Sequence, residues 1–153
     1  MKKVSEGSLL AKALNYSFLL LRYRPRSREE IISRLKEKGY PSSLIEGTLD
    51  YLEEKNYIND EEFARTAIFS SLQKGYGRRR IEFMLKKLGI EQSLIEESLK
   101  KYDFKEKIRE LVEKKIDYYK GPQKYQKILN YLISRGFDQD EIQKEMQNLG
   151  VVE

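Results

Sequence analysis

Three stretches of the chain resemble one another when they are aligned by matching one glycine in each. These glycines are Gly39, Gly89 and Gly136, and they recur about every 50 residues. An isoleucine stands eight residues before each glycine, a leucine four residues before it, and an isoleucine six residues after it. The aligned apolar residues are Ile31, Leu35, Ile45, Ile81, Leu85, Ile95, Ile128, Leu132 and Ile142. A unit repeated in this way buries its apolar face against its neighbours, so the pattern favours an elongated molecule with a long surface for large partners.

Each glycine separates two segments with the helical period, because apolar residues on both sides are spaced by three, four and seven. The glycine suits the left-handed cap that ends the first of the two helices. Capping boxes four residues later predict the start of the second helix, at Ser43-x-x-Glu46, Ser93-x-x-Glu96 and Asp140-x-x-Gln143. A further helix is expected before each pair, from Leu9 to about Tyr23, from the Asn59-x-x-Glu62 cap onward, and from Phe104 to about Tyr119.

No stretch alternates cleanly in the manner of a strand. The sequence therefore predicts an all-α fold of three tandem three-helix repeats that form an elongated, curved solenoid. The repeats are expected at residues 1–58, 59–102 and 103–153, joined by short connections without a linker rich in Pro, Gly or Ser.

Composition narrows the classes of function. The chain has no Cys and no His, which removes thiolate and imidazole chemistry and the usual zinc sites. It also lacks a nucleophile beside a base and a phosphate-binding loop, so we expect no enzyme, no cofactor, no metal and no small-molecule substrate. The acidic run at residues 60–62 suits the first turn of a helix. No apolar run approaches about 18 residues, so we expect no membrane association and a cytoplasmic protein.

The net charge of +5 arises from 30 basic and 25 acidic residues, and residues 102–153 contribute equal numbers of both. Basic residues gather at the turn between the first and second helix of each repeat. The candidate contacts to a filament or to phosphate are Arg24, Arg26, Arg28, Lys74, Arg78, Arg79, Arg80, Lys120 and Lys124. Such a stripe would bind phosphates or an acidic protein groove.

The alternative is that these cations only complement the C-terminal dipole of the helix that ends there. That explanation suits Arg22, Arg24 and Lys74. It does not suit Arg28, Arg78 and Arg79, which start the following helix, so we expect these three residues to contact a partner. Together with Arg26, they are expected to lie at exposed turns and helix starts.

Other features of the turns favour structural roles. Ser27-x-x-Glu30 is a capping box. Tyr76 lies between two glycines, where packing over the turn is favoured over stacking on a base. The glycine turns resemble a helix-turn-helix, but Glu46, Glu96 and Glu97 occupy the positions from which a sequence-specific DNA reader would present hydrogen-bond donors.

In combination, these motifs resemble the bacterial RecX regulatory proteins. The residues that carry the resemblance are Arg24-Pro25-Arg26-Ser27-x-x-Glu30, Gly39, Leu52, Asn59-Asp60-Glu61-x-Phe63-Ala64, Gly75-x-Gly77-x-x-Arg80-Ile81 and Leu88-Gly89-Ile90. They span about residues 9–100. The third repeat matches more loosely, since Gly121-Pro122 replaces the Gly-x-Gly turn.

The resemblance implies a regulator of DNA repair by homologous recombination and of the SOS response. Such a protein would dock in the groove of a RecA–DNA filament and mostly inhibit ATP hydrolysis and strand exchange by the recombinase. The alternative is a helical module that binds single- or double-stranded DNA directly and without sequence preference.

Overall fold

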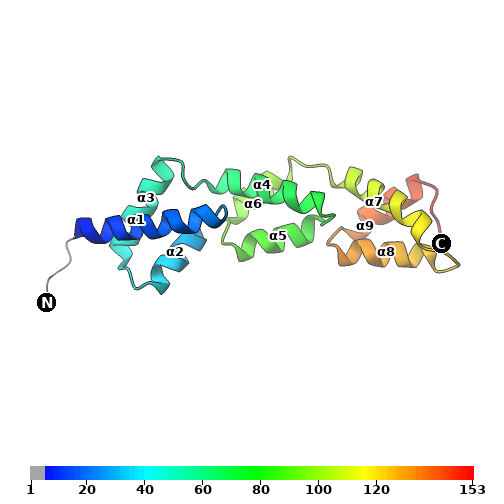
Figure 1. Cartoon of the computed structure of the whole chain (residues 1–153). Helices are drawn as coiled ribbons and strands as arrows, with labels where there is room; N and C mark the ends of the chain where they lie inside the picture. Colours follow the sequence, from blue (N-terminus) through cyan, green and yellow to red (C-terminus); the bar gives the residue numbers. More distant parts are fainter. Residues whose placement is uncertain (1–5) are drawn as a thin grey trace.

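The computed structural model describes residues 6–153, which form nine helices and no strand. The helices are α1 (Glu6–Tyr23), α2 (Arg28–Glu37), α3 (Ser42–Glu54), α4 (Asp60–Gln73), α5 (Arg78–Lys87), α6 (Gln92–Leu99), α7 (Phe104–Tyr118), α8 (Lys124–Ser134) and α9 (Gln139–Asn148). They confirm the predicted all-α fold of three tandem three-helix repeats. The repeats follow one another in an elongated row (Figure 1). The curvature of this row stays a prediction.

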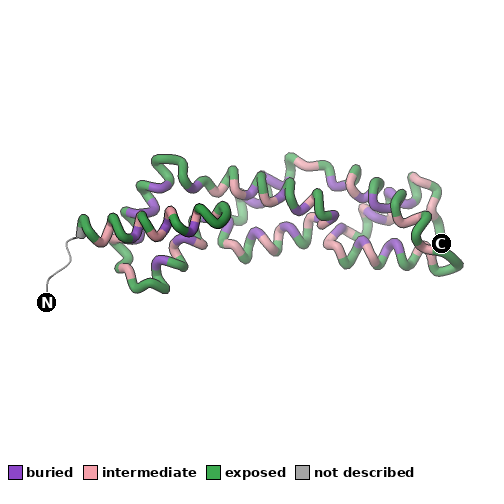
Figure 2. Tube along the Cα trace, viewed as in Figure 1, coloured by how far each residue is buried: buried purple, intermediate pink, exposed green. Residues whose placement is uncertain are grey.

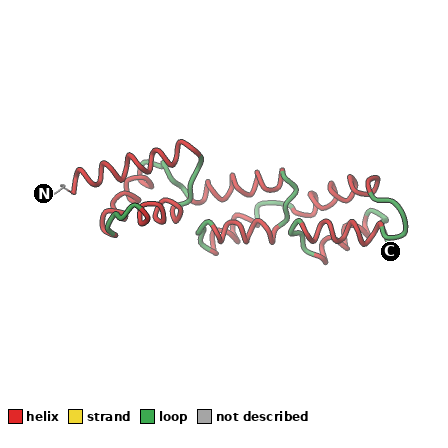
Figure 3. Tube along the Cα trace, turned by 60° about the horizontal axis from the view of Figure 1, so that its bottom comes forward, coloured by secondary structure: helices red, strands yellow, loops and turns green. Residues whose placement is uncertain are grey.

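The principal helix–helix packing occurs within the repeats. The three helices of each repeat pack on one another, as α1, α2 and α3 do in the first. Short loops connect the helices (Figure 3). Neighbouring repeats therefore meet mainly through turns and helix ends. The predicted boundaries after residues 58 and 102 lie in the connections after α3 and α6, and their positions stay predictions.

The buried side chains form two separate apolar clusters of unequal size. The first repeat has its own apolar cluster, which includes Leu35, Leu49 and Leu52. The second and third repeats share one continuous cluster that extends from Ala64 to Met146. Figure 2 shows the buried residues along the inner faces of the helices. The apolar core therefore continues across the second joint of the row but not across the first.

The aligned glycines end α2, α5 and α8 as expected. Gly39, Gly89 and Gly136 have φ values of 86°, 81° and 98°, a conformation that side chains disfavour. The amide that follows each glycine donates to a carbonyl five residues earlier, as from Tyr40 to Leu35 at 3.3 Å. Each turn is therefore a Schellman motif, in which the last carbonyls of the helix find partners.

The predicted caps of α3, α6 and α9 are each wrong by two residues, since the N-caps are Pro41, Glu91 and Asp138. These helices begin at Ser42, Gln92 and Gln139, so Ser43, Ser93 and Asp140 lie inside the first turn. The reason is that the glycine turn is short. The residue after the glycine enters the apolar core or packs against it, and the next one already occupies the N-cap position. Of these N-caps, only Asp138 accepts a hydrogen bond through its side chain, from the Glu141 amide at 3.1 Å.

The other two predicted caps are confirmed. The Ser27 hydroxyl oxygen accepts from the Glu30 amide at 3.1 Å, and the Glu30 carboxylate accepts from the Ser27 amide at 3.2 Å. The Asn59 side chain accepts from the Glu62 amide at 3.1 Å.

Candidate binding surface

The basic turns occupy the ends of the repeats rather than a stripe along an open face. The α1–α2 turn meets the second repeat, where the Ser27 hydroxyl donates to the Leu88 carbonyl at 2.6 Å. The α4–α5 turn meets the third repeat, where the Gly77 amide donates to the Arg135 carbonyl at 2.8 Å. Two of the three turns therefore hold the row together, and their arginines have partners within the protein.

In the first turn, Glu30 forms ion pairs with two of the candidate cations. Arg24 pairs with its carboxylate, and Arg26 lies 3.7 Å from it and donates to the Leu20 carbonyl at 3.4 Å. Only 14% of the Arg26 side chain is exposed, so the expectation that this residue lies open at the turn is wrong. Its aliphatic stem is covered while its head group neutralises a partly buried acid.

The same contacts set the protonation of Glu30. Burial alone would raise the pKa of its carboxyl. The hydrogen bonds from Arg24 and the Ser27 amide, with the charges of Arg24 and Arg26, outweigh burial and hold the pKa below 4.5. Glu30 is therefore a fixed anion that organises the turn.

Arg28 links three helices at the first joint. Its guanidinium pairs with Glu53 of α3, and its backbone amide donates to Asp60 of α4 at 2.8 Å. Burial raises the pKa of Asp60, although the hydrogen bond from the Arg28 amide opposes that shift. Arg28 therefore has partners inside the protein, while 44% of its side chain stays exposed, as expected. Its contact with an outside partner stays a prediction.

In the second turn, two arginines at the start of α5 extend onto the third repeat. The Arg78 guanidinium lies over the Phe104 ring, 4.6 Å from its centroid, and Arg79 pairs with Asp138 at 3.2 Å. Arg79 is nevertheless 70% exposed, so its ion pair is worth little and an outside anion can compete for it.

Arg80 and Tyr76 form the centre of this joint. The Arg80 guanidinium lies 3.8 Å from the centroid of the Tyr76 ring, and a second guanidinium, from Arg135, lies 4.3 Å from it. Arg135 also donates to the Lys74 carbonyl and, at 3.2 Å, to the Gly75 carbonyl. Tyr76 therefore packs over the turn, as the sequence favoured.

Sequence reasoning missed Arg135. Its position directly before the aligned glycine is occupied by Lys38 and Leu88 in the other repeats, so the repeat pattern gives no signal for it. Only the fold brings it to the carbonyls of the α4–α5 turn.

The candidate lysines differ from the arginines. Lys74, Lys120 and Lys124 make no ion pair within residues 6–153. Lys74 and Lys120 are exposed, and Lys124 is half-buried. These three therefore keep their charge available to phosphate or to an acidic partner.

The remaining sequence signals concern DNA reading, metal binding and membranes. Glu46, Glu96 and Glu97 are exposed on α3 and α6, where they present carboxylates to any approaching DNA. Within residues 6–153, no group of acidic side chains is arranged to hold a metal ion, and Asp60 accepts from the Arg28 amide. Over the same range, no helix is long and apolar enough to cross a membrane.

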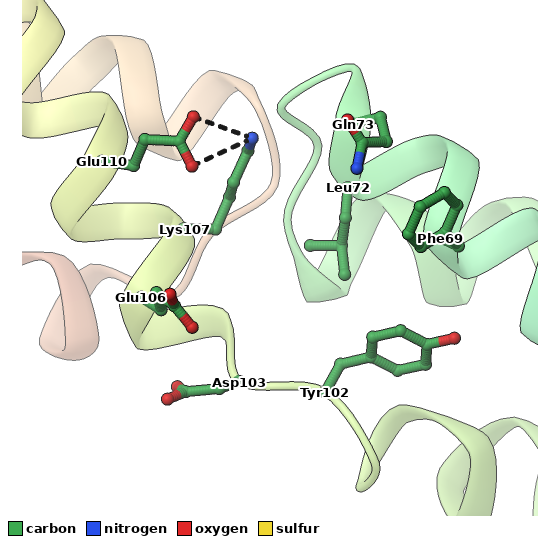
Figure 4. Close-up of a pocket in the computed structure, with 8 residues that line it drawn as sticks. All are labelled: Phe69, Leu72, Gln73, Tyr102, Asp103, Glu106, Lys107 and Glu110. Carbon is green, nitrogen blue, oxygen red and sulfur yellow. Dashed lines mark hydrogen bonds and ion pairs between the residues drawn. The ribbon is translucent and has the colours of Figure 1, made fainter.

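A cleft opens between α4 and α7, across the joint between the second and third repeats (Figure 4). Phe69 and Tyr102 lie on one side of it, and Glu110 lies on the other beside Lys107, at 3.3 Å. Lys107 and Lys114 thus neutralise the carboxylate that faces this cleft.

The fold and its turns define an all-α tandem-repeat protein. Models of the RecX family match the chain in all three repeats: the first three-helix domain at residues 13–52, the second at 59–99 and the third at 102–146. The chain belongs to the RecX family.

Named relatives agree with this assignment. Regulatory protein RecX of Caldanaerobacter subterraneus subsp. tengcongensis is 33% identical over 139 residues, which cover 88% of this chain and 69% of the relative. Regulatory protein RecX of Prosthecochloris aestuarii is 33% identical over 141 residues, covering 90% and 93%. The crystal structure of RecX from Lactobacillus salivarius superimposes with a TM-score of 0.83 at 25% identity, covering 94% and 97%. Membership of this family supports a regulatory role and is consistent with a protein that is not an enzyme.

Proposed function

We propose that this protein docks in the groove of a RecA–DNA filament and mostly inhibits ATP hydrolysis and strand exchange by the recombinase. The observation that carries the proposal is the match of all three repeats to the RecX family in an unbroken row. An elongated row can contact several filament subunits at once, and each added contact strengthens the others through effective concentration. Such a protein would act in the cytoplasm, during DNA repair.

The surface supports a partner that is both protein and nucleic acid. Lys74 and Lys120 have no internal partner and can meet phosphate or acidic side chains. The arginines of the first two turns, in contrast, already contact carboxylates, carbonyls or aromatic rings within the protein. Affinity for the filament must therefore also come from contacts other than the turn cations.

The test is a titration of the protein into a reaction that contains RecA, single-stranded DNA and ATP. We expect ATP hydrolysis to fall at amounts of protein below one per recombinase subunit. Unchanged turnover up to equimolar protein would overturn the proposal for this chain.

The second candidate is a module that binds DNA directly and without sequence preference. The lysines without partners favour it, since non-specific binding rests on phosphate contacts. Titration of naked DNA under the same conditions separates the two. Equal affinity for naked DNA and filament would promote this candidate.

A further inference from the structure

Phe83 is an exposed aromatic residue that belongs to neither apolar cluster of the fold. Its side chain lies on α5 and is 69% exposed. The aligned positions of the other two repeats hold Ser33 and Asn130, which are also exposed. The apolar side chain at this position is therefore a feature of the second repeat alone, not of the repeat pattern.

Phe83 borders a hollow of about 300 Å³ on the second repeat. Ile81, Met84 and Tyr76 supply its apolar lining, and the Ser71 hydroxyl that reaches it donates to the Met84 sulfur at 3.9 Å. The polar group in the lining thus already has a partner. A hollow of this kind favours an apolar side chain as its occupant.

The charge around the hollow is of one sign. Arg80 and Lys87 line it, and no acidic residue does. Neither cation makes an ion pair within residues 6–153. Glu82 is on the same helix but pairs with Lys86 at 3.3 Å and accepts from Gln92 at 3.2 Å. The hollow therefore combines an apolar centre with an unneutralised basic edge.

We propose that this hollow is a docking site for an acidic protein segment that presents one large apolar side chain. The apolar side chain inserts beside Phe83 and Met84, and the flanking carboxylates pair with Lys87 and Arg80. The identification of that segment as part of the recombinase rests on the proposed function.

The lining favours a protein segment over a nucleic-acid strand. Single strands are held by successive aromatic rings along a basic groove. Here two guanidinium groups already lie over the Tyr76 ring, which leaves Phe83 as the one uncovered aromatic ring in the lining. A single apolar anchor with charges beside it is typical of the centre of a protein–protein interface.

The cleft in Figure 4 supplies a matched control. Phe69, which lines it, is also an exposed phenylalanine, with 58% of its side chain accessible. Three acidic residues and only one basic residue, Lys107, line this cleft, so its net charge is negative rather than positive. Removing Phe69 deletes the same side chain from a different surface of the second repeat.

The first experiment measures the affinity of the 153-residue chain for a RecA filament on single-stranded DNA, by equilibrium titration with a labelled protein. We expect Phe83→Ala to weaken binding about tenfold or more, and Phe69→Ala to change it less than about twofold. Lys87→Glu should weaken binding about fivefold or more, whereas Lys87→Arg should leave it unchanged. All four variants should have the same melting temperature as the wild type, because the replaced side chains are exposed.

The second experiment places a photoreactive benzoylphenylalanine at position 83 and irradiates the filament complex. A crosslink to an acidic stretch of the recombinase is expected. A crosslink to the DNA strand or to a second copy of this chain would overturn the proposal.

The outcomes separate this inference from the proposed function. If the wild type and Phe83→Ala bind the filament equally well, the docking site is wrong and the regulatory proposal survives. If the wild type does not bind the filament at all, both are wrong.

Discussion

Gly136 and Arg80 approach each other so closely across the second joint that a Cβ atom on the glycine would lie 2.6 Å from the Arg80 Cβ and 2.8 Å from its amide nitrogen. Gly89 meets Glu29 in the same way at the first joint. Gly39, which has no repeat before it, meets nothing within 4 Å. The glycine turn of one repeat thus docks on the start of the middle helix of the repeat before it.

This relationship predicts different costs for the same substitution. Gly136→Ala should lower the free energy of unfolding by about 2–5 kcal/mol, because it adds a clash with backbone to the strain of a left-handed alanine. Gly39→Ala, with a similar φ and open space around it, should cost only about 1–2 kcal/mol. Urea unfolding of both variants provides the measurement. Equal losses would mean that close approach at the joint contributes nothing to stability.

The Glu30 carboxylate predicts a pH dependence. Its pKa in the folded protein lies below 4.5, so the stabilisation is complete well above pH 4.5 and is lost as the pH falls through the folded pKa. Glu30→Gln should therefore lose about 1–2 kcal/mol at pH 7, and the gap to the wild type should narrow as the pH falls through the folded pKa of Glu30. Glu54→Gln, an exposed residue without an ion pair within residues 6–153, should show no gap at pH 7. A gap at Glu30 that stays constant from pH 7 down to the onset of acid unfolding would contradict this.

The divided core predicts separate opening of the first repeat. Leu52→Ala and Ile108→Ala each remove a fully buried side chain and should cost about 2–5 kcal/mol locally. By hydrogen exchange, Leu52→Ala should lower protection in α1–α3 only, since its cluster ends there. Ile108→Ala should lower protection throughout α4–α9. Loss of protection across all nine helices in both variants would show a single cooperative unit instead.

The lysines without partners predict the response of DNA binding to salt. For naked DNA, log affinity should fall against log salt with a slope on the order of −2 to −5. Charge reversal at Lys74, Lys120 and Lys124 should flatten that slope and leave the melting temperature unchanged. Reversal of three exposed lysines outside the turns, at Lys12, Lys55 and Lys144, makes the same change in net charge. Identical slopes for the two triple variants would assign DNA binding to net charge rather than to the turns.

The fold could be predicted from the sequence because the patterns that specify it are local. Apolar spacing and the left-handed glycines specify each helix pair without reference to the rest of the chain. The predicted starts of α3, α6 and α9 were displaced because Ser43 and Ser93 satisfy the capping pattern in sequence, whereas the short turn begins the helix before them.

The candidate surface was harder to predict from the sequence, because the sequence does not show which residue a charged side chain pairs with in the fold. Arg26 and Arg28 appear in the sequence as unopposed cations, yet Glu30 and Glu53 neutralise them in the fold. Arg135 reaches the α4–α5 turn from about 60 residues further along the chain, a distance at which no spacing rule operates.

The break in the apolar core gives the molecule unequal stiffness along its length. Two thirds of the row share one packed interior and resist bending as a unit, since close-packed side chains transmit strain. The first joint has no shared apolar core and relies instead on the close approach of Gly89 to Glu29 and on hydrogen bonds and ion pairs such as those from Ser27 and Arg28. Bending or torsion imposed by a bound partner would therefore concentrate at that joint, and the first repeat would rotate while the other two move as one rigid body.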